Sequence, residues 1–386
     1  MIIAIDGNEA NLKNRVGVNM FAFGVLWGLY NLARSTIRGS RRIGNLGGVT
    51  PFMVFLSENP RADLPPETKW WKYEVFGPKP LWTWVGLVKR LYLGKPRPDV
   101  FFTPSHYGPG FCSIPYVISI MDLGFLRYPR QFTKKDFWQL KNWTAWSARK
   151  ASKIIAISQF TKDNIIKTYG LGKDRVVVAY PGYKKTNSPV GEKKLKAIKK
   201  KYGIRGKYLL CLGTLKPSKN IIGLVEAYRI LLKKNPDLKI NLVIAGKKGW
   251  LYEEIFNKVN QLGLGNRVIF TGFIEDREMP ALMKGSQVFC IPSFWEGFGM
   301  PALEAMSLGV PAVAGKAGSL PEIVGKAGVL VDPYQPKKIA EGIEKVLENQ
   351  GLRARIIKKG KQRIGMFNWA NCSKIIYQTL IEVAKQ

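Results

Sequence analysis

The chain has 386 residues, of which 46% are hydrophobic and 23% are charged, so it can bury the cores of two ordinary domains and is not a disordered polymer. Its 61 basic and 27 acidic residues give a net charge of +34, spread evenly over the two halves of the sequence. Such a basic body indicates an anionic partner: a phosphorylated substrate, an anionic lipid surface or nucleic acid. The single histidine, His106, excludes a metal centre built from histidines.

The four cysteines lie far apart in apolar runs without a C-x-x-C spacing, which argues against a disulfide framework and favours a reducing cytosol. The opening MIIAIDGNEA shows no secretory leader, and no window of about 18 residues is free of charge and turn formers. We therefore expect a cytoplasmic protein.

Apolar runs of strand length alternate with helical patterns over the first part of the chain. The strands are expected at MIIAID, TPFMVFL, PDVFFT, PYVISIM, KIIAIS and RVVVAY. Helical stretches such as NMFAFGVLWGLYNLA and KKDFWQLKNWTAWSARKA lie between several of them. Strands that alternate with helices predict a parallel α/β sheet.

A polar, lysine-rich stretch then indicates a linker near residues 184–192, followed by a basic helix. The alternation restarts with KYLLCLGT, KINLVIAG, RVIFTGF, QVFCIPS and PAVAG as strands. We predict a Rossmann-like domain over residues 1–185, a second over 186–367, and a final helix over 368–386 that packs back on the first domain. In open parallel sheets, ligands bind beyond the carboxyl ends of the strands.

The stretch SFWEGFGMPALEAM, residues 293–306, places two glutamates eight residues apart around a glycine turn. Pro301 suits the start of a helix, so Glu304 is expected in the first turn, at the positive end of the helix dipole. The glycines let the backbone approach a ligand, and a helix N-terminus behind them suits a phosphate. Because Glu296 and Glu304 suit paired sugar hydroxyls, the pattern fits a nucleotide sugar. A glutamate that merely complements its helix dipole would not explain Glu296.

The form E-G-F-G-x-P-x-x-E-A-M resembles the E-x7-E signature of retaining GT-B glycosyltransferases of family four. The resemblance covers nearly the whole chain and includes RVGVNMF, PYVISIMDLGFLRYP, AISQFTKDNI, LGTLKPSKN, GSLPEIVG and the late FNW. It implies a GT-B architecture, in which two Rossmann-like domains face each other across a cleft. The first domain would bind the acceptor and the second the nucleotide sugar.

The resemblance also implies the residues that bind the donor. Glu304 would bind the ribose hydroxyls, and Glu296 would lie beside the transferred sugar. The other implied positions are Phe298 and Gly299 at the sugar and diphosphate, Gly213, Thr214 and Lys219 in the diphosphate clamp, Phe273 and Ile274 in a loop that reads base and sugar, and Arg15 and Gly17 in the glycine loop over the phosphates.

Thr214 departs from the family pattern, which has an arginine in the clamp. Threonine cannot brace two phosphate oxygens as a guanidinium does. Lys216 or Arg15 is a candidate to compensate, and the sequence does not choose between them.

Met121 is a second departure, since relatives have a histidine before Asp122, near the transferred sugar. Methionine neither donates a hydrogen bond nor carries charge. Three outcomes stay open: the backbone at Met121 suffices, His106 replaces the imidazole, or the activity is weak or absent. The candidate catalytic residues are Glu296, His106 and Asp122.

The chain has no Asp-x-Asp pair of the kind that holds a metal on a diphosphate. Lysine, backbone amides and a helix dipole can neutralise the leaving group instead, so we predict no metal and no cofactor. The resemblance implies retention at the anomeric carbon, with the leaving phosphate oxygen taking the proton of the acceptor.

Residues 78–98 mix aromatic, aliphatic and basic side chains in a way that is typical of a helix on an anionic membrane. The apolar ones are Trp82, Trp84, Leu87, Val88, Leu91 and Tyr92, and the basic ones are Lys79, Lys89, Arg90, Lys95 and Arg97. A second basic candidate is the segment 34–42. The alternative is a core helix with a solvated basic face.

Together these features predict a cytoplasmic glycosyltransferase, peripheral on the inner face of the membrane, that uses a nucleotide sugar. Its acceptor would be phosphorylated or lipid-linked, in envelope or exopolysaccharide assembly. One alternative is sugar transfer to nucleic acid, which also suits the charge. Another is a nucleotide-sugar-binding pseudoenzyme, which Thr214 and Met121 favour.

Overall fold

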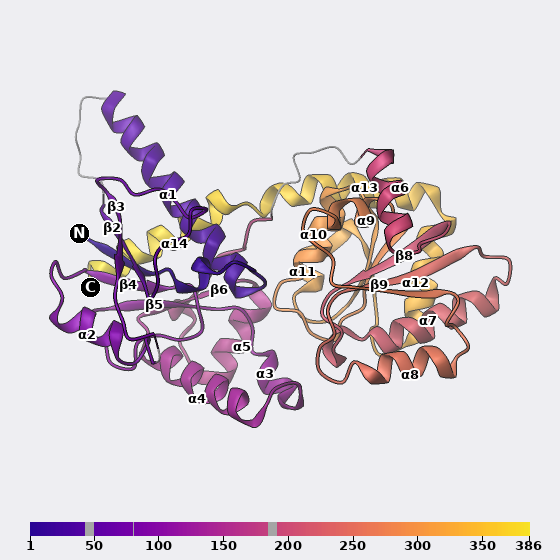
Figure 1. Cartoon of the computed structure of the whole chain (residues 1–386), viewed down its shortest axis with the longest axis horizontal. Coiled ribbons are helices and arrows are strands. Elements are labelled where there is room, and N and C mark those ends of the chain that lie inside the picture. The colour runs from indigo at the N-terminus through magenta and orange to yellow at the C-terminus, as the bar shows by residue number, and fades with distance from the viewer. Residues whose placement is uncertain (43–49, 80, 184–190) are drawn as a thin grey trace. The chain divides into compact units, whose positions relative to one another are not determined.

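The computed structural model describes residues 1–42, 50–79, 81–183 and 191–386, with the backbone alone for residues 38–42. The chain forms two compact units (Figure 1). The first comprises Met1–Leu126, Lys134–Gly182 and Phe367–Gln386, and the second Arg127–Thr133 and Tyr183–Met366. Arg127–Thr133, a stretch inside the predicted first domain, thus groups with the second unit. The predicted linker lies almost wholly outside the described residues.

The described part of the first unit has a seven-stranded parallel sheet in the order β3-β2-β1-β4-β5-β6-β7. Its strands are β1 (Ile3–Asp6), β2 (Phe52–Leu56), β3 (Trp71–Val75), β4 (Val100–Thr103), β5 (Tyr116–Ile120), β6 (Lys153–Ala156) and β7 (Val176–Val178). Every residue of the central strands β1, β4 and β5 is buried. Unbroken apolar runs suit strands of a parallel sheet that is covered on both faces.

The helices of this part of the chain are α1 (Val18–Arg42), α2 (Gly86–Leu93), α3 (Gly124–Arg127), α4 (Lys134–Lys150), α5 (Gln159–Tyr169) and the final α14 (Trp369–Ala384). The final helix α14 packs closely against α1. A Cβ atom added at Gly24 would lie 2.3 Å from the Trp369 ring, and one at Gly28 would lie 1.9 Å from Ser373 Oγ. The two glycines therefore make room for the side chains of α14.

The described part of the second unit has a six-stranded parallel sheet in the order β10-β9-β8-β11-β12-β13. Its strands are β8 (Lys207–Leu212), β9 (Ile240–Ala245), β10 (Val268–Gly272), β11 (Val288–Ile291), β12 (Ala312–Gly315) and β13 (Val329–Val331). Side chains of β8 alternate between two apolar cores: Leu209 and Cys211 belong to one, Tyr208 and Leu210 to the other. The sheet is therefore buried on both faces.

The helices of the second unit are α6 (Glu192–Lys201), α7 (Ile221–Lys234), α8 (Glu253–Gln261), α9 (Met279–Lys284), α10 (Met300–Ser307), α11 (Leu320–Val324), α12 (Pro336–Glu348) and α13 (Gln350–Arg363). The strand order reverses direction once in each sheet, between β1 and β4 and between β8 and β11. Ligands of such sheets bind outside the carboxyl ends of the strands at this switch point.

The predicted membrane helix over residues 78–98 is wrong in part. Only α2 is helical there, and Trp82, Leu87 and Leu91 lie in the core. Trp82 stacks on Phe76, at 5.3 Å between ring centroids, and its Nε1 donates to the Phe76 carbonyl oxygen. These side chains therefore support the fold rather than a membrane contact.

The second basic candidate, residues 34–42, forms the end of α1, and the side chains from residue 38 on lie outside the described residues. In the described ranges, no helix combines the length and the apolar character that crossing a bilayer requires.

Candidate functional site

Lys219 and Glu296 meet at the switch point of the second sheet. Lys219 ends the 3-10 turn η4 (Pro217–Lys219) after β8, and Glu296 lies in the loop after β11. Lys219 Nζ lies 2.6 Å from Glu296 Oε1, and Ser293 Oγ donates to the same oxygen at 2.8 Å. Because Glu296 is only 8% exposed, the ammonium and the hydroxyl offset the cost of burying its charge.

Hydrogen bonds to backbone carbonyl oxygens hold the loop that carries Glu296 in place. Asn220 adopts a left-handed conformation, with φ 54°, and its Nδ2 donates to the carbonyl oxygens of Pro292 and Pro333. Both the hydroxyl and the backbone N–H of Ser319 donate to the carbonyl oxygen of Glu296, at 3.0 and 3.1 Å. The loops that follow β8, β11, β12 and β13 are thus joined around Glu296, which gives the carboxylate a fixed position.

The position predicted for Glu304 within its helix is wrong by one residue, which takes it out of the first turn. Gly299, with φ 92°, lets α10 begin at Met300, one residue before Pro301, and no acidic residue lies in the first turn. Glu304 is therefore the fifth residue of α10. Burial, and then the charge of Asp276, raise the pKa of Glu304 to about 7. A carboxyl group in this state can change protonation when a ligand binds.

The clamp loop after β8 packs tightly against its neighbours. A Cβ atom at Gly213, whose φ is 156°, would lie 3.7 Å from Lys219 Cε. One at Gly249 would lie 2.7 Å from Thr214 Cγ2. The Thr214 methyl group therefore faces the loop after β9, and glycine is the residue that lets the two loops approach.

Three further donor-binding candidates differ in how exposed they are. Phe298 and Ile274 are buried, so their side chains offer a ligand little surface. Phe273 is exposed and its ring is accessible.

In the first unit, the loops after β4 and β5 bring His106, Met121 and Asp122 together. The Met121 N–H donates to His106 Nε2 at 3.3 Å, so the imidazole lies beside Met121, the position for which the family resemblance implies a histidine. Burial lowers the pKa of His106 although Asp122 raises it, which favours the neutral ring. Because Nε2 accepts, the ring proton sits on Nδ1, which is buried and has no hydrogen-bond partner among the described residues.

Asp122 has a local role in the structure. Its Oδ1 accepts from the Gly124 N–H at 2.6 Å, at the first residue of the short helix α3. This contact fixes the chain that follows Met121.

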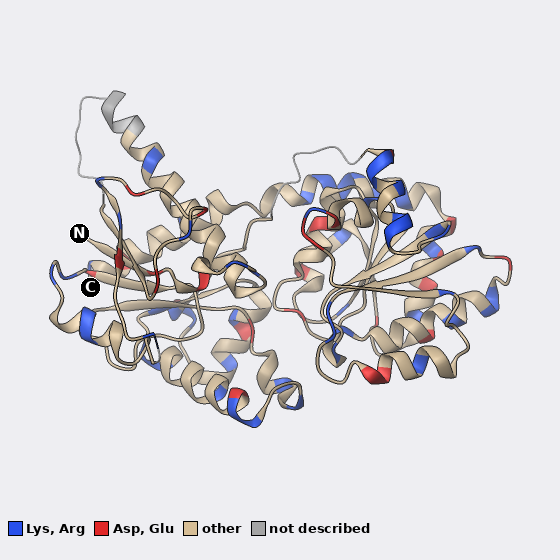
Figure 2. Cartoon of the chain, in the orientation of Figure 1, with Lys and Arg blue, Asp and Glu red and all other residues tan. Residues whose placement is uncertain are grey.

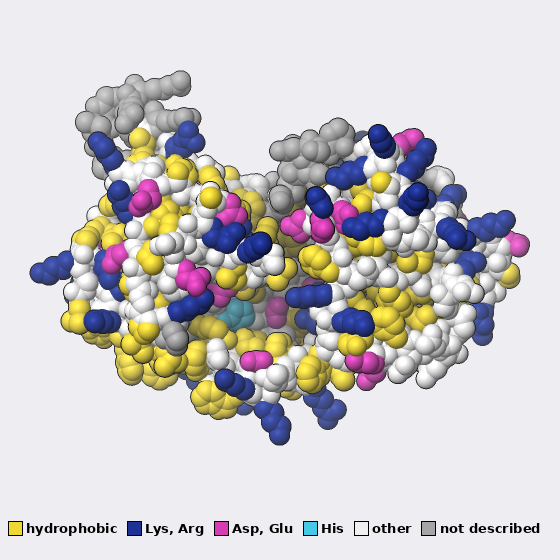
Figure 3. Space-filling view, in the orientation of Figure 1, with side chains coloured by type: hydrophobic (Ala, Val, Ile, Leu, Met, Phe, Trp, Pro, Cys, Tyr) yellow, Lys and Arg dark blue, Asp and Glu magenta, His cyan; other side chains and the backbone are white. Residues whose placement is uncertain are grey.

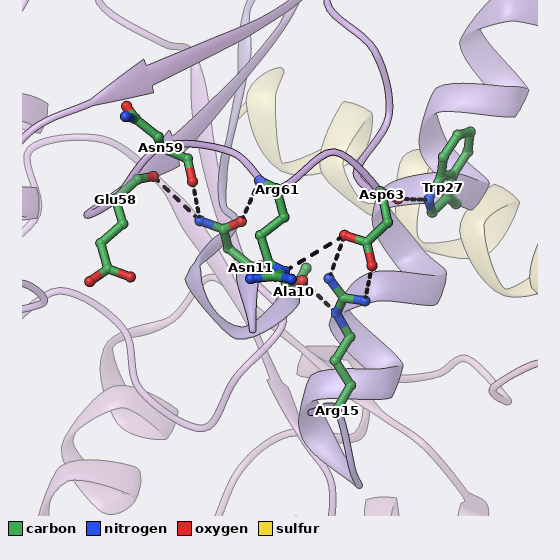
Figure 4. A network of polar contacts seen from close by, with 8 residues as sticks. All are labelled: Ala10, Asn11, Arg15, Trp27, Glu58, Asn59, Arg61 and Asp63. Atoms are coloured by element: carbon green, nitrogen blue, oxygen red, sulfur yellow. Dashed lines mark hydrogen bonds and ion pairs between the residues drawn. The ribbon is translucent and has the colours of Figure 1, made fainter. Parts of the chain in front are cut away.

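Arg15 is held within the first unit (Figure 4). Its two terminal nitrogens donate to the two carboxylate oxygens of Asp63 at 2.7 and 2.9 Å, and Nε donates to the Ala10 carbonyl oxygen. The guanidinium also lies 4.1 Å from the centroid of the Phe23 ring. The Arg15 guanidinium is therefore engaged by partners of its own unit.

Gly17 lies in the same loop after β1 and has φ 53°. No atom lies within 4 Å of the position that a Cβ atom would occupy there. The Cβ side of the Gly17 backbone is therefore uncovered, as is required of a loop whose backbone approaches a ligand.

The sequence analysis missed two carboxyl groups beside this loop. Asp6 ends β1 and accepts from the backbone and side-chain nitrogens of Asn8, both at 3.0 Å, while burial raises its pKa to about 7. Burial also raises the pKa of Glu9, which accepts from Asn19 Nδ2. The sequence did contain a signal for Asp6, because this acidic residue ends an apolar strand.

Comparison with known proteins identifies the family of the chain. The family model described as glycosyl transferases group 1 matches residues 194–363, and the one described as Glycosyltransferase Family 4 matches residues 54–185. O-antigen chain mannosyltransferase B of Escherichia coli is 30% identical over 274 residues, which are 69% of this chain and 71% of the relative. Mannosylfructose-phosphate synthase of Agrobacterium fabrum is 26% identical over 235 residues, 58% of this chain and 52% of that one.

Solved structures show the same architecture. Anabaena HepE in complex with UDP aligns over 99% of both chains with a TM-score of 0.70 and 20% identity. WaaG, described as a glycosyltransferase of lipopolysaccharide biosynthesis, aligns over 98% of this chain and 99% of its own with a TM-score of 0.67 and 14% identity. The fold is GT-B, and the protein is a hexosyl-transferring enzyme. The chain belongs to the group 1 glycosyltransferases of family four.

Proposed function

We propose that this enzyme is a retaining glycosyltransferase that moves a hexose from a nucleoside-diphosphate sugar to a phosphorylated or lipid-linked glycan in envelope or exopolysaccharide assembly. The observation that carries the proposal is the Lys219–Glu296 pair at the switch point of the second sheet. The glycine turn and the N-terminus of α10 follow Glu296 directly in the sequence, so backbone N–H groups and a helix dipole adjoin the residue that Lys219 contacts.

Each side chain of this group has one role in the proposal. Lys219 binds the diphosphate and offsets the charge that develops on the leaving group, and the N-terminus of α10 adds to this effect. Glu304 accepts hydrogen bonds from the ribose hydroxyls. Glu296, held by Ser293 and Lys219, lies next to the transferred sugar and accepts from its hydroxyls.

The reaction breaks the bond between the anomeric carbon and the diphosphate oxygen, which leaves with the electron pair. The acceptor oxygen attacks the oxocarbenium-like carbon from the same face, and its proton passes to the departing phosphate oxygen. In the first unit, His106 has an Nδ1–H without a partner among the described residues, a donor of suitable kind for a sugar or phosphate oxygen. Positive charge comes from the protein, so the reaction needs no metal ion.

A mannosyl nucleotide is the first donor to test, because relatives of this chain are named as mannosyltransferases, one of them for O-antigen chains. The same relative supports a carbohydrate acceptor of the cell envelope, and the net charge of +34 supports work at an anionic membrane on its cytoplasmic side.

The test is transfer from mannosyl and glucosyl nucleotides to lipid-linked acceptors, with the anomeric configuration of the product read by NMR. The product should keep the α configuration of the donor, and an excess of chelator should leave the rate unchanged. An inverted product would refute the retaining mechanism. A rate that a chelator abolishes and manganese restores would refute metal independence.

A further inference from the structure

Large apolar side chains are exposed over one stretch of the first unit, between α2 and α4. They are Leu81, Val85, Tyr92, Leu93, Phe111 and Trp138, and we call this set the apolar surface. Leu93, Phe111 and Trp138 are 74%, 63% and 61% exposed. Figure 3 shows hydrophobic side chains gathered on the side of the first unit where Figure 1 places α2 and α4. Large exposed apolar side chains that gather on one face of a protein mark a binding site.

Two ring contacts connect neighbours of this surface to α4. The rings of Trp84 and Trp143 lie 5.2 Å apart, which joins the start of α2 to α4. Trp146 of α4 packs against Phe111, at 6.3 Å between ring centroids, and its Nε1 donates to the Gly110 carbonyl oxygen. Phe111 is therefore packed on α4, the helix that also carries Trp138.

Basic side chains surround the apolar surface. Exposed ones are Lys89, Lys95 and Arg97 beside α2, and Lys134, Lys135, Lys141, Arg149 and Lys150 on α4. Figure 2 shows blue segments on both helices. Arg90, which the sequence analysis counted with them, is instead buried and paired with both carboxylate oxygens of Glu74. Residues 81–97 contain no acidic residue, and α4 contains one, Asp136.

We propose that this face of α2 and α4 is the surface by which the enzyme binds an anionic lipid bilayer, with the apolar surface inserted and the basic residues at the headgroups. Tryptophan and tyrosine favour the interface, and Leu81, Val85 and Leu93 favour the acyl region. This deepens the peripheral-membrane part of the proposed function. It can be tested without the transfer reaction, because lipid binding needs no donor.

Two other partners fit the surface less well. Single-strand binding depends on aromatic stacking, for which Tyr92, Phe111 and Trp138 are exposed, but Leu81, Val85 and Leu93 offer a base nothing to stack on. A second copy of the chain would bring the same eight cations against themselves, because a two-fold interface pairs each patch with its own copy.

The experiment is flotation of the full chain with vesicles of phosphatidylglycerol and phosphatidylcholine, compared with phosphatidylcholine alone. The variant Leu93→Ser/Phe111→Ser/Trp138→Ser should lower the bound fraction on anionic vesicles about tenfold or more. Its matched control, Ile230→Ser/Met366→Ser, removes exposed apolar side chains from the second unit and should bind like the wild type. The variant Lys89→Ser/Lys95→Ser/Arg97→Ser should also bind weakly, whereas Lys193→Ser/Lys194→Ser/Lys196→Ser on α6 should not.

Thermal stabilisation by a nucleoside diphosphate serves as the second readout and should be the same in every variant. The proposal is overturned if the triple apolar variant binds anionic vesicles as the wild type does, or if neutral vesicles bind the wild type equally well. It is also overturned if the wild type binds single-stranded DNA but no vesicle. A protein that binds vesicles but no nucleotide would contradict the proposed function and leave this inference standing.

Discussion

In the proposed mechanism, Lys219 is the residue on which the chemistry of the second unit depends most. Replacing Lys219 by alanine removes the cation from the diphosphate and leaves the buried Glu296 with Ser293 Oγ as its remaining hydrogen-bond donor among the described contacts. We expect kcat/KM to fall about 10²-fold or more, since a group that stabilises developing charge typically contributes this much. Lys239→Ala, an exposed lysine just before β9 at the opposite end of the sheet, is the matched control and should keep full activity. Equal activity of both variants would remove Lys219 from the mechanism.

The raised pKa of Glu304 predicts how the affinity for the donor depends on pH. Because its pKa is raised to about 7, the carboxyl group is protonated below that pH and ionised above it. An ionised carboxylate accepts from both ribose hydroxyls, whereas the acid has one oxygen occupied by its proton. Affinity for a nucleotide sugar should therefore increase about tenfold as the pH rises from about 6 to about 8 and then level off.

Glu304→Gln is the control for this pH dependence, since glutamine keeps the size of the side chain and cannot titrate. Its affinity should be low and flat over the same range, as measured by calorimetry. A variant with the pH profile of the wild type would show that another group titrates.

At the scale of elements, the contact between α1 and α14 makes a prediction about stability. Gly24→Ala places a methyl group 2.3 Å from the rigid Trp369 ring, so one of the helices must shift. We expect a loss of about 1–3 kcal/mol in the free energy of unfolding, measured by denaturant titration. Gly351→Ala in α13 is the matched control, because the nearest atom would lie at 3.5 Å, and it should be neutral or slightly stabilising. An unchanged Gly24→Ala protein would contradict the close packing of the two helices.

The elements that the sequence predicts best are those with unbroken apolar runs, such as β1, β4 and β5. It missed β3 and β13, and the reason is physical. In β3, Lys72 and Glu74 alternate with the apolar residues and Trp71 is the one buried residue, as suits the edge strand of a sheet. β13 is a three-residue edge strand. The start of α10 was missed by one residue, because a left-handed Gly299 is not visible in the sequence.

The burial of residues 81–98 could not be read from the sequence either. A Trp- and Lys-rich helix has the same pattern whether it faces a core or a membrane. The tertiary contacts of Trp82 and Arg90, with Phe76 and Glu74, decide which side chains are exposed. By contrast, Lys219 and Glu296 could be predicted to act together, because they follow two strands whose carboxyl ends share an edge of one sheet.

At the scale of the whole molecule, the last helix returns to the first unit, so the two units are not independent segments of sequence. A chain that ends at residue 366 lacks α14, whose Ile376, Leu380 and Val383 are buried. The first unit should then lose its resistance to proteolysis, while fragments within Tyr183–Met366 survive longer. A first unit that stays as resistant as in the full chain would show that α14 contributes little to its core.

The central claim is that the second unit binds a nucleoside diphosphate through Glu304 and Lys219. The most direct measurement is thermal stabilisation by UDP, GDP, dTDP and ADP and their sugars, in the wild type beside Glu304→Ala and Lys219→Ala. One nucleotide should stabilise the wild type by roughly 2.7 kcal/mol at about 100 times its dissociation constant, and both variants should lose most of this effect. The central claim would be contradicted if a nucleotide stabilised both variants as much as the wild type. It would also be contradicted if no nucleotide stabilised any of the three proteins.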